Sequence, residues 1–140
     1  EYEFYLDLDC TSPLRDVSDI SACIAQFRDR RQKGVDGVFS ICTAQKNPYF
    51  VLLEVDDNGA LKICKKFSST IVRRQDAPAV YEHVGSIYVF SPEYIRSASY
   101  LLDGHTEGYD IGIEKSLDVD SEFDFLLVEY MMKRKRGILS

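Results

Sequence analysis

The feature that most constrains the fold is a short alternating strand near the start of the chain that ends abruptly in a polar turn. Between residues 4 and 8, apolar and polar side chains alternate, which is the period of a β-strand. Thr11-Ser12-Pro13 then ends the pattern, because proline fixes its own φ angle and disfavours helical geometry in the residue before it. Ligands of open α/β sheets bind where strands give way to loops, so we expect Asp9, Thr11, Ser12 and Arg15 to border a binding site.

A helix and a second strand follow this turn. Val17, Ile20, Ile24 and Phe27 recur at helical spacing and predict a helix from about residue 16 to residue 32, with Gly34 as its stop. Residues 36–43 then read as a strand. A strand, a helix and a strand in this order predict a βαβ unit with parallel pairing, and hence an α/β fold.

The middle of the chain interrupts this alternation. Two β-rich runs, residues 49–55 and 60–64, flank Asp56-Asp57-Asn58-Gly59, a strong hairpin signal. We therefore expect residues 46–84 to form an inserted hairpin element that projects from the sheet, within a single domain of residues 1–140. Because residues 1–8 read as a strand in progress, we also expect an N-terminal portion of the domain to be missing.

The remaining elements are a strand at 85–90, a short helix starting at Ser91-Pro92, and a strand at 108–114. A last helix is expected to begin with a capping box formed by Ser121 and Asp124. It carries an apolar stripe at helical spacing, formed by Phe123, Leu126, Leu127, Tyr130 and Met131. It ends in the basic run 133–136, which we interpret as a solvated helix end rather than a site for an anionic partner.

Composition narrows the classes of function. The 140 residues carry a net charge of -6, which argues weakly against nucleic acid as the main partner. No apolar run approaches the roughly 18 residues of a membrane span. Four cysteines without a C-x-x-C pair and only two histidines make a structural zinc site improbable. We expect Cys23, Cys42 and Cys64 to be reduced core residues, and a cytosolic location fits this best.

Two further groups of residues could carry chemistry. Asp118 and Asp120 are expected on one face of a strand, where two close carboxylates favour a cation such as Mg²⁺. The alternative is a capping aspartate beside a solvated neighbour. The cluster Arg73-Arg74-Gln75, preceded by several lysines, suggests an anionic ligand, and the alternative is surface charge on a loop. Tyr88 could simply pack within its strand.

Five segments in this order resemble the CMP-sialic acid synthetases (acylneuraminate cytidylyltransferases). They are T-S-P-L-R at 11–15, S-I-C-T-A-Q-K-N-P-Y at 40–49, R-R-Q-D-A-P at 73–78, G-S-I-Y-V at 85–89 and L-D-V-D-S-E-F-D-F at 117–125. The similarity covers nearly the whole chain. It implies a Rossmann-like, three-layer α/β fold of the nucleotide-diphospho-sugar transferase type, with a mostly parallel sheet, and a homodimer joined by the projecting hairpin.

The resemblance also implies a reaction in which CTP and a nonulosonic acid give the CMP-sugar and pyrophosphate. By this resemblance Asp118 and Asp120 hold Mg²⁺ and Arg74 contacts the sugar acid, and these three are the expected catalytic residues. Gln75 and Tyr88 match positions lining the sugar pocket, beside Asp9, Thr11 and Ser12.

Three departures from the family pattern bear on the substrate. Asp9 stands where glutamine is usual, which favours a legionaminic- or pseudaminic-type sugar, and Val84 replaces a common asparagine. The N-terminal loop that binds the CTP phosphates is absent, so we expect these 140 residues alone to be inactive. The alternatives are a non-catalytic dimerising or sugar-binding fragment, and a cytidylyltransferase for another sugar acid such as 3-deoxy-manno-octulosonate.

Overall fold

The computed structural model describes residues 2–67, 75 and 77–138. These residues form two compact units. The first combines the chain up to Cys42 with the chain from His83 onward, and the second spans Thr43–Glu82. Each unit is described by itself.

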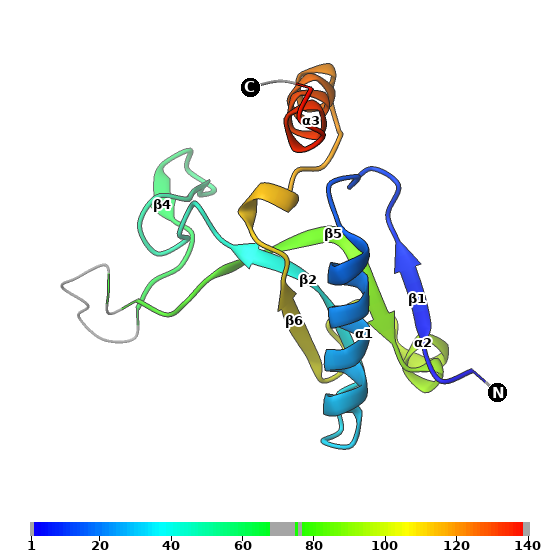
Figure 1. Cartoon of the computed structure of the whole chain (residues 1–140). Helices are drawn as coiled ribbons and strands as arrows, with labels where there is room; N and C mark the ends of the chain where they lie inside the picture. Colours follow the sequence, from blue (N-terminus) through cyan, green and yellow to red (C-terminus); the bar gives the residue numbers. More distant parts are fainter. Residues whose placement is uncertain (1, 68–74, 76, 139–140) are drawn as a thin grey trace. The chain divides into compact units, whose positions relative to one another are not determined.

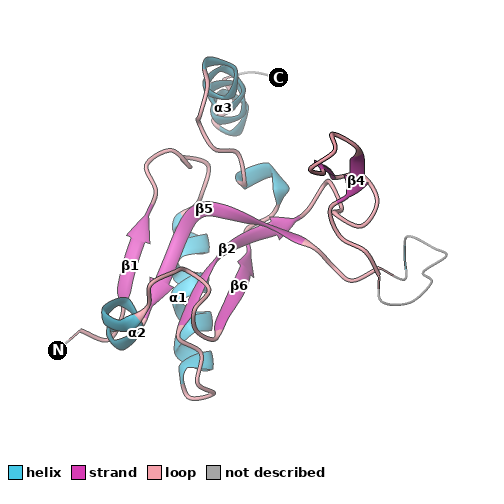
Figure 2. Cartoon of the chain, turned by 180° about the vertical axis from the view of Figure 1, so that it is seen from behind, coloured by secondary structure: helices cyan, strands magenta, loops and turns pink. Residues whose placement is uncertain are grey.

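The first unit is built on a four-stranded mixed sheet. Its strands are β1 (Tyr5–Leu8), β5 (Tyr81–Phe90), β2 (Gly37–Thr43) and β6 (Thr106–Asp110), in that spatial order. β1 and β5 are antiparallel, whereas β2 and β6 are parallel. Figure 2 shows β5 running opposite to the other three strands. The α/β fold class is confirmed, but the expected direct pairing of the first two strands is wrong, because β5 is inserted between β1 and β2.

Helices cover both faces of this sheet (Figures 1 and 2). On one face, α1 (Val17–Arg31) contributes Cys23 and Phe27 to a core that includes residues of β2 and β5. On the other face, Tyr94 of α2 (Pro92–Ser97) packs with Phe39 and Phe90. The hydroxyl of Ser91 accepts a hydrogen bond from the Tyr94 N–H at 3.1 Å and caps α2, as the sequence predicts.

The chain after β6 departs from the strand pattern expected for it. β6 ends at Asp110, a 3-10 turn covers Ile113–Lys115, and residues 117–120 form no strand. Gly112 has a φ of 80°, a geometry that L-residues disfavour and that turns the chain out of the sheet. The prediction of a strand carrying Asp118 and Asp120 on one face is therefore wrong.

The last helix, α3 (Glu122–Lys135), starts with the predicted capping box between Ser121 and Asp124. Its buried side chain is Val128, which is 4% exposed, whereas Phe123 of the predicted apolar stripe is 74% exposed. Lys133 pairs with Glu129 at 3.0 Å and Lys135 pairs with Asp16, so these basic residues act as helix-end charges within this unit.

The second unit contains the predicted hairpin, β3 (Leu53–Val55) paired antiparallel with β4 (Leu61–Ile63). The Asp56 carboxylate accepts hydrogen bonds from the N–H groups of Asn58 and Ala60, both at 2.9 Å, and closes the turn. Residues 48–51 form turns rather than a strand.

The four cysteines are free. Cys23 and Cys42 are buried as expected, but Cys64 is exposed, which corrects its assignment to the core. Across the described ranges, no helix has the length and apolar character needed to cross a membrane.

Candidate functional site

The loop after β1 is held in place by one arginine. The Nη1 atom of Arg15 lies 2.6 Å from the Asp9 carbonyl oxygen and 2.7 Å from that of Ser12. The same nitrogen lies 3.3 Å from the carbonyl oxygen of Ser86 on β5. A charged donor shared among carbonyl oxygens fixes the curvature of the loop, because each such bond is stronger than a neutral one. The loop therefore presents Asp9 and Thr11 in a defined orientation next to β5.

β5 is distorted where it meets this loop. Val84 and Ile87 both face the α1 side of the sheet, although a regular strand would place them on opposite faces. The buried hydroxyl of Ser40 on β2 fills the irregularity: it accepts from the Ile87 N–H at 2.8 Å and donates to the Val84 carbonyl at 2.8 Å. The irregularity between Val84 and Ile87, where β5 carries one extra residue, has the features of a β-bulge. Such bulges are common beside active sites.

Asp118 is delivered to the same place by the segment after β6. The Val119 N–H donates to the Thr11 carbonyl oxygen at 3.0 Å, which ties the segment to the loop after β1. The Oδ1 atom of Asp118 accepts from the Val119 N–H at 3.1 Å and lies 3.4 Å from the Ser12 hydroxyl, which is fully buried. The buried Ser12 hydroxyl thus helps to hold the Asp118 carboxylate in position.

Three oxygen atoms converge above Gly85. A Cβ atom built on Gly85 would lie 3.4 Å from the Tyr88 hydroxyl, 3.7 Å from Asp9 Oδ2 and 3.8 Å from Asp118 Oδ2. The Oδ1 atom of Asp9 is engaged by the Thr11 N–H at 3.0 Å and the Thr11 hydroxyl at 2.9 Å. Both carboxylates are thus anchored through Oδ1 and direct Oδ2 toward one point.

The surroundings set the charge of these groups. The two hydrogen bonds from Thr11, helped by the Arg15 charge, hold the pKa of Asp9 below its usual value, so this carboxylate stays ionised. Burial raises the pKa of Tyr88, and the nearby carboxylate of Asp9 adds to the effect, so the phenol keeps its proton. The point above Gly85 therefore faces one phenolic O–H donor among carboxylate acceptors.

Of the residues that the sequence singles out, the structure brings together Asp9, Thr11, Ser12, Tyr88 and Asp118. Asp120 is exposed, two residues beyond Asp118. Gln75 is exposed in the second unit, and Arg73 and Arg74 lie outside the described residues. The proposed contact of Arg74 with a sugar acid therefore stays a prediction.

A metal ion would need oxygen ligands beyond those gathered here. Among the residues that the structure describes, no three His, Cys, Asp or Glu side chains are grouped so as to hold a metal ion by themselves. Mg²⁺ usually takes one or two carboxylates and completes its shell with waters and substrate phosphates. The carboxylates of Asp118 and Asp120 have the chemistry that such a partial site requires.

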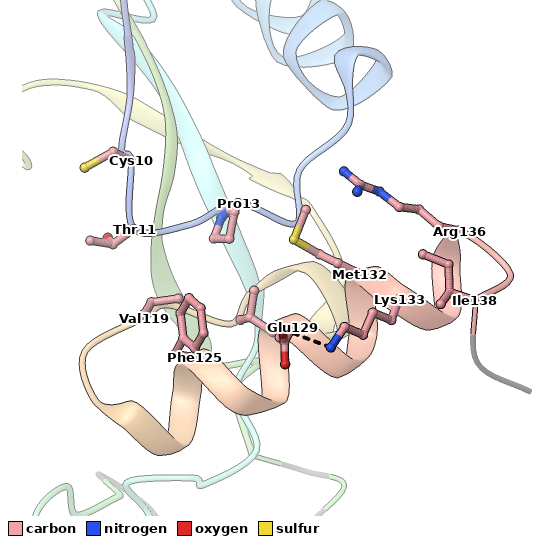
Figure 3. A pocket seen from close by; sticks show the side chains of 11 residues that line it. Cys10, Thr11, Pro13, Val119, Phe125, Glu129, Met132, Lys133, Arg136 and Ile138 are labelled. Atoms are coloured by element: carbon pink, nitrogen blue, oxygen red, sulfur yellow. Dashed lines mark ion pairs between the residues drawn. The ribbon is translucent and has the colours of Figure 1, made fainter.

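An apolar cavity of about 540 Å³ lies beside the site, between the loop after β1 and α3 (Figure 3). Thr11, Pro13 and Val119 line it together with Phe125, Val128 and Met132 of α3. The cavity shares Thr11 and Val119 with the site, so α3 packs behind the residues that position Asp9 and Asp118.

The sequence interpretation missed two residues that shape the site, Ser40 and Gly85. Ser40 leaves a signal, because it is a polar residue in the otherwise apolar run G-V-F-S-I-C of β2. Arg15 closes the T-S-P-L-R segment and is predicted to lie at this edge, but its bonds to the carbonyl oxygens of Asp9, Ser12 and Ser86 are not. Gly85 gives no sign of its role, because its neighbours Asp9 and Asp118 are distant in the sequence.

Comparison with known proteins relates the chain to several named relatives. No family model matches the chain. It is 33% identical over 135 residues to post-translational flagellin modification protein B of Campylobacter coli, covering 96% of this chain and 55% of that protein. It is 33% identical over 92 residues to CMP-N,N'-diacetyllegionaminic acid synthase of Campylobacter jejuni, covering 66% of this chain and 38% of that protein.

A third relative is N-acylneuraminate cytidylyltransferase of Streptococcus agalactiae, 32% identical over 127 residues, or 90% of this chain and 29% of that protein. Over most of its length the chain is similar to members of the CMP-sialic acid synthetase family. It spans about half the length of the flagellin modification protein and less of the other two.

The fold agrees with this assignment. A crystal structure of 4-diphosphocytidyl-2C-methyl-D-erythritol synthase from Anaerococcus prevotii superposes with a TM-score of 0.59, covering 94% of this chain and 59% of that one. The sequence identity is 11%, so this likeness concerns the fold alone. It confirms the expected nucleotide-diphospho-sugar transferase type of fold.

Proposed function

We propose that the protein containing this chain transfers CMP from CTP to a nonulosonic acid and releases pyrophosphate. The observation that carries the proposal is the convergence of Asp9, Tyr88 and Asp118 around one point, although they come from three separate segments. All three segments contain or adjoin motifs shared with the CMP-sialic acid synthetases. The relatives named for legionaminic and N-acylneuraminic acids support a substrate of the nonulosonic class.

In this reaction the anomeric hydroxyl oxygen of the sugar acid forms a bond to the α-phosphorus of CTP. The bond between that phosphorus and the oxygen bridging to the β-phosphate breaks, pyrophosphate leaves, and the hydroxyl proton passes to solvent. Mg²⁺, when bound, would neutralise charge on the phosphates. The chain's own contribution is orientation: Thr11 and Arg15 hold Asp9, and Ser12 holds Asp118, so the sugar meets groups that are already placed.

In this proposal Asp118 and Asp120 hold the metal ion, and Arg74 and Gln75 contact the sugar acid with Asp9 and Tyr88. Thr11 and Ser12 act on substrate through the carboxylates that they fix. A homodimer formed through the second unit is part of the proposal. The hairpin supports it by exposing Leu53, Val55 and Leu61 in the described chain.

The proposal is tested by measuring pyrophosphate release from the full-length protein with CTP, Mg²⁺ and a panel of nonulosonic acids. We expect turnover with at least one acid. In Asp118→Asn and Asp120→Asn the turnover rate should fall at least about 100-fold, because losing a metal ligand costs more activity than losing one of its supporting contacts. Asp57→Asn, in the exposed hairpin turn, is the matched control and should keep full activity.

Two outcomes would contradict the proposal. Absence of turnover with every acid in the panel would remove the enzyme function. Unchanged turnover in Asp120→Asn would remove that residue from the metal site while leaving the reaction in place.

A further inference from the structure

His83 and Tyr88 lie on the same face of β5, which a regular strand would not allow. Side chains alternate between the two faces of a strand, so residues five positions apart face opposite ways. The β-bulge between Val84 and Ile87 shifts this alternation by one residue. The two ring centroids are therefore only 5.4 Å apart, with an interplanar angle of 62°, which is an edge-to-face contact.

A third ring, that of Phe39 on β2, completes an aromatic cluster with His83 and Tyr88. Phe39 is buried and meets His83 edge-to-face at 5.1 Å, with an interplanar angle of 86°. It also lies 6.4 Å from Tyr88, so each of the three rings contacts the other two. The buried ring of Phe90 stacks on Tyr88 at 6.2 Å. Of these three neighbours of the Tyr88 ring, His83 is the exposed one.

The contacts of the Tyr88 ring determine where its hydroxyl lies, because the ring is rigid and only two side-chain torsions precede it. That hydroxyl lies with the carboxylates of Asp9 and Asp118 beside Gly85. Burial lowers the pKa of His83, so the imidazole is neutral at pH 7 and packs against the other rings without a charge that would need solvation. His83 thus has the position and the charge state of a ring that supports Tyr88.

We propose that His83 is a positioning residue of the sugar-acid site and that it acts through its ring contact with Tyr88. This inference rests on the proposed function, in which Tyr88 contacts the sugar acid. Phe39 and Phe90 hold the Tyr88 ring from within the core, whereas His83 holds it at the surface. Without the His83 ring, the hydroxyl of Tyr88 is less well fixed before the sugar binds, and ordering it then costs binding free energy.

The test compares His83→Ala with His83→Phe in the full-length protein, assayed by pyrophosphate release with the best acid of the panel. Alanine removes the ring contact, and we expect KM for the sugar acid to rise at least about threefold, in keeping with the strength of one aromatic pair. Phenylalanine keeps a ring there and should keep the wild-type KM. KM for CTP should stay unchanged in both variants. His105→Ala, at the other exposed histidine of this unit, is the matched control.

A double-mutant cycle tests whether His83 acts through Tyr88. Tyr88→Phe removes the hydroxyl and keeps the ring, so adding His83→Ala to it should not raise KM for the sugar acid any further. Effects that add in the double variant would show that His83 acts by another route and would contradict the inference.

The outcomes separate the two proposals. Wild-type protein without turnover on any acid would overturn the proposed function, and this inference with it. Wild-type turnover together with an unchanged KM in His83→Ala would overturn the role of His83 alone. A His83→Phe protein as impaired as His83→Ala would also overturn that role, because the imidazole nitrogens would then matter rather than the ring contact. Equal rises in KM for CTP and the sugar acid, or a His83→Ala protein that fails to fold, would assign His83 to the fold and contradict the inference.

Discussion

Ser40 is a single hydroxyl group on which the geometry of the site depends. It is fully buried and bonds to both ends of the irregular stretch of β5: it accepts a hydrogen bond from the Ile87 N–H and donates one to the Val84 carbonyl. Because Val84 and Ile87 face the same side of the sheet, the irregular part of β5 places Gly85 and Tyr88 beside Asp9. A buried polar residue in a strand is costly unless it is fully paired, and here the pairing is what shapes the neighbouring strand.

We predict that Ser40→Ala lowers the free energy of unfolding by about 2 kcal/mol, because it leaves buried N–H and C=O groups of β5 without a partner. Urea denaturation measures this difference. The control is Ser21→Ala on α1, whose hydroxyl also bonds to a backbone carbonyl, at 3.0 Å, but is exposed. It should change stability by less than about 0.5 kcal/mol. Equal effects of the two substitutions would show that Ser40 does not support β5.

At the residue scale, the sequence predicts which residue types meet but not how they are held. Asp9, Tyr88 and Asp118 could be selected because they stand in or beside motifs. The contact of Arg15 with β5 and the place of Gly85 beside Asp9 require knowing that the loop after β1 lies against β5, which is a contact between segments about 70 residues apart. Local patterns carry no information about such pairings.

At the scale of elements, an ion pair links the start of α1 to the turn that precedes Asp118. Lys115 lies 2.7 Å from the Oδ2 atom and 2.8 Å from the Oδ1 atom of Asp19, whose side chain is 7% exposed. The Tyr109 hydroxyl donates to the same carboxylate at 3.2 Å. These contacts fix the 3-10 turn over α1, and the chain continues from this turn to Asp118.

We predict that Lys115→Met lowers the free energy of unfolding by about 2 kcal/mol at pH 7, less than a fully buried pair would cost because Lys115 is 31% exposed. The hydrogen bond to Asp19 raises the pKa of Lys115 above its usual value. A raised lysine pKa stabilises the folded state fully below the unfolded pKa, near 10.4, and this contribution is lost as the pH rises through the folded value.

The difference between wild type and Lys115→Met should therefore stay constant from pH 6 to about 9 and close only above the usual lysine pKa. Urea denaturation at several pH values measures it. Lys33→Met is the control, since Lys33 lies 3.9 Å from Asp29 and both are well exposed. A difference that closes below pH 9 would contradict this account of the pair.

Elements differ in how well the sequence predicts them. Helix α1 and the caps of α2 and α3 follow the predictions, because spacing and capping residues are local signals. The strand expected at 108–114 ends early, because Gly112 turns the chain out of the sheet. The apolar stripe of α3 contains Phe123 and Leu126, yet the helix buries Val128, since the orientation of a helix depends on what it packs against.

At the scale of the whole molecule, the α/β class follows from the order of strands and helices, whereas the strand order does not. The sequence predicts that β1 and β2 pair across α1. The structure places β5 between them, because a strand that comes later in the chain can insert between earlier ones without leaving a local signal. This insertion brings Tyr88 and Gly85 next to Asp9, so the site depends on the part of the topology that the sequence does not predict.

The measurement that tests the central claim most directly is the mass of the product formed by the full-length protein from CTP, Mg²⁺ and a nonulosonic acid. The account predicts a CMP-nonulosonate, one for each pyrophosphate released, and at least about 100-fold less of it in Asp118→Asn. Pyrophosphate released without any CMP-sugar, or no product with any acid tested, would contradict it.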